Sequence, residues 1–189
     1  MEEQAMACAK KNARKTGKTI VFIDESGLSE RPTRVRTWSP KGQTPILQYS
    51  FSWKQLSVIA GISYWQFYFR FFPGAIRSPQ IVEFLKVLRR QIAGKLLIIW
   101  DGLRAHRSHM VRDYAEQQGG DIQLEFLPAY APELNPTEYI WGYLKTHEIG
   151  NLCARHVGEV RDLASRRLRS MQRRPALVRA FWTQAELVF

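Results

Sequence analysis

The sequence predicts an α/β protein with a mixed five-stranded sheet that is covered by helices on both faces. In the first part of the chain, apolar residues recur in short runs of strand length that are separated by turn residues. After Pro73-Gly74 the hydrophobic period changes from two to near 3.6, and helical segments then alternate with two further apolar runs. Successive strands without a helix between them favour a meander, and strands joined through a helix favour βαβ units, so the combination predicts a mixed sheet.

The first half of the chain is expected to form a three-stranded antiparallel meander. Its strands are predicted at Thr19 to Glu25, Gln55 to Ile62 and Trp65 to Phe71. Val35 to Ser39 has the same alternating pattern and is followed by a turn at Pro40-Lys41-Gly42.

The second half begins with an amphipathic helix. Ser78 and Pro79 have the character of an N-cap with proline at the first helical position, and the helix is expected to end near Ala93-Gly94. The elements predicted after it are a strand from Leu96 to Trp100, a helix from His106 to Gln118, a strand from Ile122 to Leu127, a helix that opens after Asn135, and a basic helix from His156 onward.

The length of 189 residues is that of one domain with a sizeable core. No internal repeat or low-complexity linker marks a boundary. We therefore expect a basic N-terminal arm over residues 1–18 and one domain over residues 19–189 that includes the basic C-terminal helix.

The charge indicates a polyanionic partner. Twenty-eight Lys and Arg against 17 Asp and Glu leave a formal net charge of +11, which is typical of proteins that bind nucleic acid. The expected DNA contacts are Lys145 and three arginines of the C-terminal helix, Arg166, Arg167 and Arg173, although a merely solvated helix face is the alternative. Trp53 lies in a polar loop and is a candidate for stacking on a base, with core packing as the favoured alternative. Core packing is the default for the tryptophans in apolar runs, namely Trp38, Trp65, Trp100 and Trp141.

Other features of the sequence exclude further classes. No apolar run approaches the ~18–20 residues of a membrane span, and the N-terminus lacks a signal-peptide core, so we expect an intracellular protein with no membrane partner. Cys8 and Cys153 are too few for a disulfide framework and are expected to be reduced thiols.

Three carboxylates stand at positions that suit a metal site. Asp24 and Asp101 each end an apolar strand, and Glu138 stands near the start of a helix. Asp24 and Glu25 point to opposite faces of their strand, so both cannot face one ion. Mg²⁺ prefers hard oxygen ligands and needs only a few carboxylates from different elements. We expect the three side chains to converge at the carboxyl-end edge of the sheet.

Each of these residues also has a purely structural interpretation. An acid after a strand often caps the next turn, and Asn135 with Glu138 three residues later is a capping-box arrangement. His106 and Asn135 are interpreted as residues that support the ligands, with a phosphate contact or a helix start as alternatives for His106. A zinc site that combines His106, His109 and Cys153 has little support, because no second spaced pair is present.

Three segments, FIDES (22–26), IIWDGLRAH (98–106) and LPAYAPELNPTEYIWGYLK (127–145), resemble the catalytic signatures of mariner-like DDE transposases, and more closely those of the bacterial insertion-sequence branch. The resemblance implies a ribonuclease H-like fold in which Asp24, Asp101 and Glu138 hold two Mg²⁺ or Mn²⁺ ions. It implies hydrolysis and strand transfer at transposon ends, double-stranded DNA as substrate and target, and a dimer on DNA. A bacterial relative would work in the cytoplasm, at the nucleoid.

The chain departs from this family in two respects. Relatives carry an N-terminal helix-turn-helix region, whereas only 18 residues precede the first predicted strand, so we expect a separate domain or protein to recognise the ends. Gly102 stands where many relatives have Asn after the second Asp. The alternatives are an inactive DNA-binding remnant and a structure-selective nuclease of the same fold.

Overall fold

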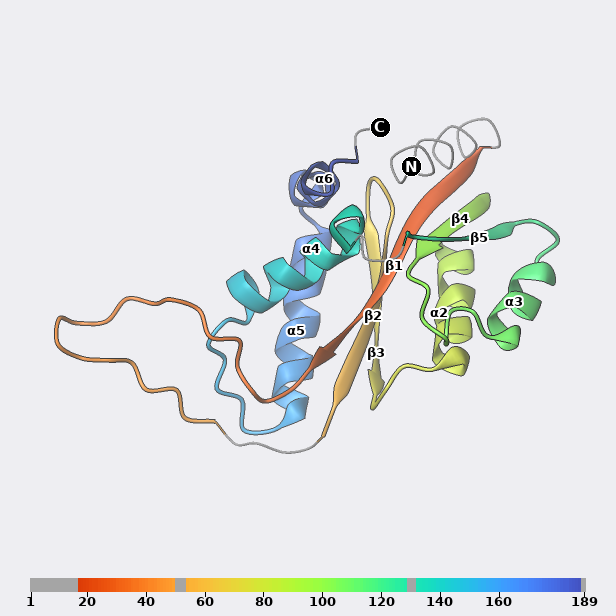
Figure 1. Ribbon diagram of the computed structural model, residues 1–189. Helices are drawn as coiled ribbons and strands as arrows, with labels where there is room; N and C mark the ends of the chain where they lie inside the picture. The colour runs from red at the N-terminus through yellow and green to blue at the C-terminus, as the bar shows by residue number, and fades with distance from the viewer. Residues whose placement is uncertain (1–16, 50–53, 129–131, 188–189) are drawn as a thin grey trace.

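The computed structural model describes residues 17–49, 54–128 and 132–187 (Figure 1). A five-stranded sheet in the order β3-β2-β1-β4-β5 forms its centre. The β1–β2 and β2–β3 pairs are antiparallel, and the β1–β4 and β4–β5 pairs are parallel. The predicted mixed sheet is therefore confirmed, with strands β1 (Lys18–Leu28), β2 (Leu56–Ile62), β3 (Phe67–Pro73), β4 (Lys95–Trp100) and β5 (Ile122–Phe126).

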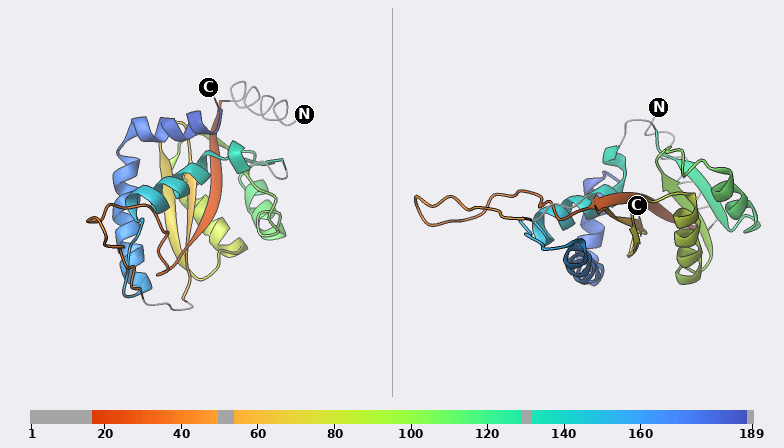
Figure 2. Two further views of the ribbon diagram at one scale, coloured as in Figure 1. Left: turned by 60° about the vertical axis from the view of Figure 1, so that its left-hand side comes forward. Right: turned by 90° about the horizontal axis from the view of Figure 1, so that it is seen from below.

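Helices cover both faces of the sheet, as Figure 2 shows in two further views. One face carries α2 (Ser78–Gln91) and α3 (His109–Glu116), and the other carries α4 (Pro136–Tyr143), α5 (Val157–Gln172) and α6 (Pro175–Gln184). A short 3₁₀ turn, η1 (Pro132–Leu134), precedes α4, and a π-helical turn, η2 (Leu144–Glu148), continues it. No helix in the described part of the chain has the length and apolarity needed to cross a membrane.

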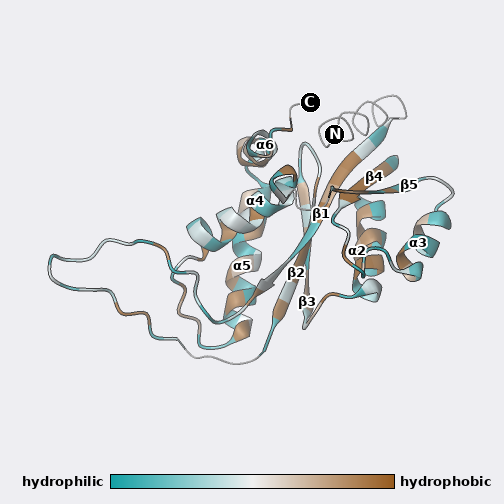
Figure 3. Ribbon diagram, in the orientation of Figure 1, coloured by the Kyte–Doolittle hydropathy of each residue, from teal (hydrophilic) through white to brown (hydrophobic). Residues whose placement is uncertain are grey.

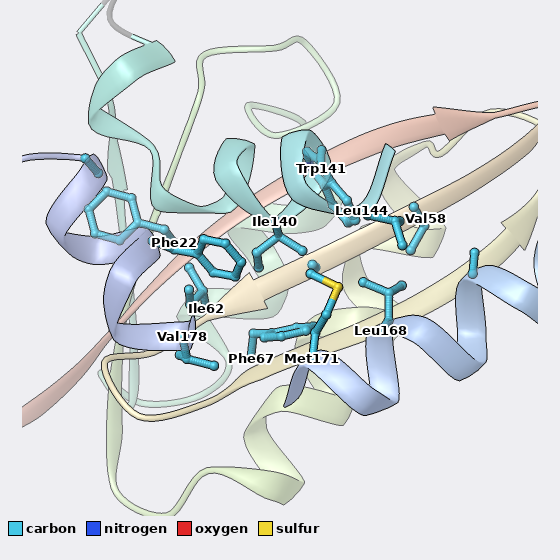
Figure 4. Close-up of a cluster of buried hydrophobic side chains, with 14 of the residues drawn as sticks. Phe22, Val58, Ile62, Phe67, Ile140, Trp141, Leu144, Leu168, Met171 and Val178 are labelled. Carbon is cyan, nitrogen blue, oxygen red and sulfur yellow. The ribbon is translucent and has the colours of Figure 1, made fainter. Parts of the chain in front are cut away.

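Alternation along β1 divides the core into two layers. Phe22 packs on the α4 side against residues that include Ile140 and Leu168, and the close-up in Figure 4 shows this cluster between the strands and α4, α5 and α6. Val21 and Ile23 pack on the other side, against α2 and α3. β4 is buried on both faces, as expected for a strand whose residues are nearly all hydrophobic and brown in Figure 3. Both faces of β1 and β4 are covered, so their residues are mostly apolar. The charged residues at the ends of these strands therefore need an explanation other than packing.

The segment from Val35 to Ser39 does not form the predicted strand. It belongs to a long connection between β1 and β2 that projects from the body of the domain in Figure 1. The base of this connection is held because Val35 N donates to Asn151 Oδ1 over 2.9 Å and Asn151 Nδ2 donates to Val35 O. Beyond that point Trp38 is fully exposed. Its pattern suits a strand, but no neighbouring strand pairs with it among the described residues.

Four other predictions were wrong in detail. The N-cap of α2 is Arg77 and not Ser78, so Pro79 takes the second helical position. Trp65 is 66% exposed in the β2–β3 turn and does not pack in the core. The helix after Asp101 begins at His109, with Ser108 as its N-cap, so His106 lies in the preceding turns. The single basic helix is two helices, because Pro175 begins α6 immediately after α5 has ended.

Candidate active site

Asp24 and Asp101 occupy equivalent positions on neighbouring parallel strands. The last backbone pair between β1 and β4 is Phe22 with Ile99, and each aspartate lies two residues beyond its member of that pair. The two residues therefore follow the same edge of the β1–β4 ladder, where carboxyl ends of parallel strands commonly form sites. Asp24 remains inside β1, whereas β4 has ended at Trp100.

Helix α4 is attached to β1 beside Asp24. The buried Asn135 caps the helix, since its Oδ1 accepts from Thr137 N over 3.1 Å. The buried Thr137 Oγ1 donates to Phe22 O over 3.1 Å, and Trp141 Nε1 donates to Asp24 Oδ2 over 2.8 Å. Glu138 is three residues before Trp141 and so lies on the same side of α4.

The carboxyl group of Asp24 is protonated more readily than an ordinary aspartate. It is only 9% exposed, and burial, followed by the charges of Glu138 and Glu25, raises its pKa from 3.8 to about 8. The hydrogen bond from Trp141 acts in the opposite direction but does not compensate. A carboxyl group in this position gains most from a nearby cation, because the cation stabilises its charged form.

Asp101 belongs to a hydrogen-bonded array that crosses to the other side of β1. His106 Nδ1 lies 2.6 Å from Asp101 Oδ1, and His106 Nε2 lies 2.8 Å from Glu25 Oε1. Leu103 N also donates to Asp101 Oδ1, over 3.0 Å. Burial alone would raise the pKa of Asp101, but the bonds from His106 and Leu103 outweigh it and lower the pKa.

His106 is held as an imidazolium. It is 1% exposed, and its ring stacks on Trp100 with 4.6 Å between centroids and 4° between planes. Burial alone would lower its pKa, but hydrogen bonds and charge from Asp101 and Glu25 raise it to about 10. Both ring nitrogens therefore donate, one to each carboxylate. The array fixes the Asp101 side chain and leaves its Oδ2 without a hydrogen bond from any described residue.

The structure separates the two interpretations of Glu138. Its backbone N–H bonds to Asn135 O over 3.1 Å, while the cap itself is the Asn135 side chain. Among described residues, the Glu138 carboxylate accepts no hydrogen bond from the backbone N–H of Asn135, so a capping box is not formed. The Glu138 side chain is exposed and lines an open hollow of about 550 Å³ along α4. Its carboxylate is therefore available.

The three carboxylates are not gathered into one closed cluster. Within the described residues, no group of three His, Cys, Asp or Glu side chains is arranged to hold a metal ion. Asp24 interacts with Glu138, whereas His106 and Leu103 hold Asp101. This differs from the expected convergence, and repulsion between like charges is a sufficient reason. The donor set still fits Mg²⁺ or Mn²⁺, because it offers hard carboxylate oxygens and a buried aspartate whose charged form lacks compensation.

The other predicted residues lie around this site or outside the described chain. Lys145 is half-buried in η2, two turns beyond Glu138, and lines a small cavity near the end of β1. Arg166 on α5 and Arg173 at its C-cap are exposed, and Arg167 Nε lies 3.6 Å from Glu148 Oε2. Trp53 and residues 1–16 of the predicted arm lie outside the described residues. The described part of the chain forms no zinc site from His106, His109 and Cys153.

The sequence interpretation missed three contributing residues: Glu25, Thr137 and Trp141. Alternation did place Glu25 on the face opposite Asp24, but its partner His106 is 81 residues away. Thr137 and Trp141 have contacts with β1 at separations of 115 and 117 residues. The sequence did contain one signal for Thr137 and Trp141. Their spacing relative to Glu138 places all three residues on one side of a helix.

Comparison with known proteins identifies the family. Residues 19–160 match the model of the DDE superfamily endonuclease family. The chain belongs to the DDE superfamily endonucleases. This DDE domain is similar to the Mos1 strand transfer complex, with 17% identity, a TM-score of 0.69, and coverage of 98% of this chain and 57% of that chain. It is also similar to the catalytic domain of Mos1 mariner transposase, with 15% identity, a TM-score of 0.61, and coverage of 98% of this chain and 84% of that chain.

These likenesses establish the fold of the DDE domain. The Mos1 mariner paired end complex with Mn matches with a TM-score of 0.67 at 18% identity and over 57% of its length. The ribonuclease H-like fold predicted from the three motifs is thus confirmed. A search among curated proteins found no match. Assignment of the DDE domain to the bacterial insertion-sequence branch stays a prediction.

Proposed function

We propose that this chain is the catalytic domain of a DNA transposase that hydrolyses phosphodiester bonds at transposon ends and then joins the freed 3′ ends to target DNA. The observation that carries the proposal is the placement of Asp24 and Asp101 at equivalent positions on β1 and β4, with Glu138 on a helix bonded to β1. Membership of the DDE endonucleases supports the same class of reaction.

Asp24, Asp101 and Glu138 are proposed to hold one or two Mg²⁺ or Mn²⁺ ions. When bound, such ions would activate the attacking oxygen and stabilise the leaving oxygen. The Mos1 transposase is known in complexes with Mn and with Mg, which supports this choice of metals.

The surrounding residues are assigned the task of orienting these ligands. Trp141 Nε1 and the backbone N–H of Glu25 both donate to the carboxylate of Asp24 and so restrict its orientation. His106, which is anchored by Glu25, occupies Oδ1 of Asp101 and directs Oδ2 outward. With a pKa of about 8, Asp24 carries a proton at neutral pH. This proton must leave when the carboxylate binds a metal ion. Binding of metal at neutral pH is therefore expected to release a proton.

Double-stranded DNA is the proposed partner, both as transposon end and as target. A net charge of +11 and exposed arginines on α5 suit a polyanion. The Mos1 neighbours include a paired-end complex with a left transposon end, which supports pairing of two ends by a dimer. The chain spans 57% of the Mos1 chain in the strand transfer complex, so recognition of the ends is assigned to a further domain or protein. A bacterial, nucleoid-associated location in the cytoplasm is proposed with this role.

The test is nicking of supercoiled or end-bearing DNA in the presence of Mg²⁺ or Mn²⁺. The chain is compared with Asp101→Asn, which keeps the volume of the side chain and removes its charge, and with Asp162→Asn, an exposed acid on α5, as the matched control. We expect cleavage to fall by at least about 100-fold in Asp101→Asn alone. An end-recognition region is supplied by fusion in a parallel arm.

Three outcomes separate the candidate functions. Metal-dependent cleavage at matching ends supports the transposase, and cleavage governed by DNA structure alone supports a nuclease of the same fold. DNA binding without cleavage, even with the recognition region supplied, identifies an inactive remnant. Full cleavage by Asp101→Asn would refute the assignment of the site.

A further inference from the structure

Arg107 is held beside Asp101 by contacts that do not neutralise its charge. It lies in the connection from β4 to α3, directly after His106. Its Nε donates to Gly102 O over 3.1 Å, and its Cζ lies 4.5 Å from the centre of the Phe126 ring. Phe126 ends β5, the strand beside β4, so the guanidinium spans two strand ends at the edge that carries Asp101.

The environment of Arg107 differs from that of three arginines that are ion-paired. Arg70, Arg89 and Arg174 each have a carboxylate partner within ion-pair distance. No such partner accompanies Arg107 in the described part of the chain, and its acceptor is a neutral carbonyl. The Nη1 and Nη2 groups, with their N–H donors, therefore remain available to a ligand.

Gly102 makes room for this arrangement. A Cβ atom added at Gly102 would lie 2.8 Å from Nη2 of Arg107, which is closer than a Cβ can approach, and 3.2 Å from its Nε, which is a tight contact. The three atoms nearest to such a Cβ all belong to the Arg107 side chain. A side chain at position 102 would therefore displace the guanidinium and leave the backbone in place.

We propose that Arg107 binds a backbone phosphate of the DNA strand next to Asp101, and that Gly102 and Phe126 hold the guanidinium in position for it. The ligand class is a phosphodiester, for which the planar, permanently charged guanidinium offers paired donors. Because the side chain is already ordered by the carbonyl and the ring, little rotamer entropy remains to be lost on binding. This inference rests on the proposed function, since it assigns one phosphate contact of the DNA substrate.

The experiment measures binding of a random-sequence DNA duplex in EDTA, over a series of salt concentrations. The variants are Arg107→Ala, Gly102→Ala and the double variant, with Arg104→Ala as the control, because Arg104 is exposed in the same connection. Melting temperature is measured for each variant. Binding in EDTA does not require cleavage, so this test can fail or succeed independently of the proposed catalysis.

We expect Arg107→Ala to lower affinity about tenfold and to reduce the salt dependence, d log K/d log[salt], by about one. Gly102→Ala keeps the charge but moves the guanidinium, so it should lower affinity to a similar extent with an unchanged melting temperature. The double variant should bind no more weakly than Arg107→Ala, because both changes remove one contact.

Two results would overturn the inference. One is wild-type affinity of a folded Gly102→Ala, because the position of the guanidinium would then not matter. The other is an equal loss in Arg104→Ala and Arg107→Ala, which would make the effect one of net charge. If Gly102→Ala unfolds, Phe126→Leu replaces it, since this change removes the ring under the guanidinium, and wild-type affinity of that variant would again refute the inference.

Discussion

Asp24→Asn should make the protein more stable while it abolishes cleavage. The aspartate is 9% exposed and is influenced by the charges of Glu138 and Glu25, so its ionised form is disfavoured in the folded chain. Asparagine has nearly the same shape, and its Oδ1 can still accept the bond from Trp141 Nε1. The substitution thus removes the unfavourable charge and keeps the packing.

The magnitude follows from the pKa. Folding raises the pKa of Asp24 from 3.8 to about 8, so between these values the folded chain binds a proton that the unfolded chain has released. Stability therefore falls as the pH rises, by about 1.4 kcal/mol for each pH unit. Removal of the group should raise the free energy of unfolding by roughly 3 kcal/mol at pH 6 and roughly 5 kcal/mol at pH 8, and by under about 1 kcal/mol at pH 4.

Urea denaturation of wild type and Asp24→Asn at these three pH values, in EDTA, measures the effect. Asp162→Asn is the control, since it removes an exposed acid and should change stability by less than about 0.5 kcal/mol at every pH. If the difference in stability between Asp24→Asn and wild type does not grow from pH 4 to pH 8, folding does not raise the pKa of Asp24. Addition of Mg²⁺ should stabilise the wild type more than Asp24→Asn, because the variant lacks the ligand.

His106→Gln should lower the free energy of unfolding by roughly 3–5 kcal/mol near pH 6, because it leaves Glu25 and Asp101 without their shared donor. The pKa of His106 rises from 6.5 to about 10, so its contribution is complete below pH 6.5 and disappears as the pH rises through 10; denaturation over pH 6–10 tests this, and a constant difference would contradict it. Glu138→Gln should abolish nicking with a change in stability under about 0.5 kcal/mol, since Asn135 provides the cap; a loss of about 0.5–2 kcal/mol with nicking intact would identify Glu138 as a cap instead. Charge reversal of Arg166 and Arg173 together should weaken duplex DNA binding and lower the salt slope by about two or more, and an unchanged slope would leave α5 as a solvated face.

The strand periodicity and the acids at strand ends were sufficient to predict the sheet, because burial on both faces leaves a continuous apolar run that ends abruptly at a polar residue. They also placed Asp24 and Glu25 on opposite faces, which the partners of the two side chains confirm. The bridge between Glu25 and Asp101 through His106 could not be predicted, because it depends on how two segments far apart in sequence pack at one strand end. Trp38 has a pattern typical of a strand but no partner strand, so local alternation was misleading there.

The alternation of β1 has a consequence for insertions and deletions. Asp24 faces α4 while its neighbour Glu25 faces His106, and the backbone of β1 is paired on both sides, with β2 and with β4. Deletion of one residue between Lys18 and Asp24, with the upstream pairing kept, would bring Glu25 to the α4 face and present Ser26 to His106. Residues of β1 should therefore tolerate substitution far better than any change in chain length, and homologous strands should align here without gaps.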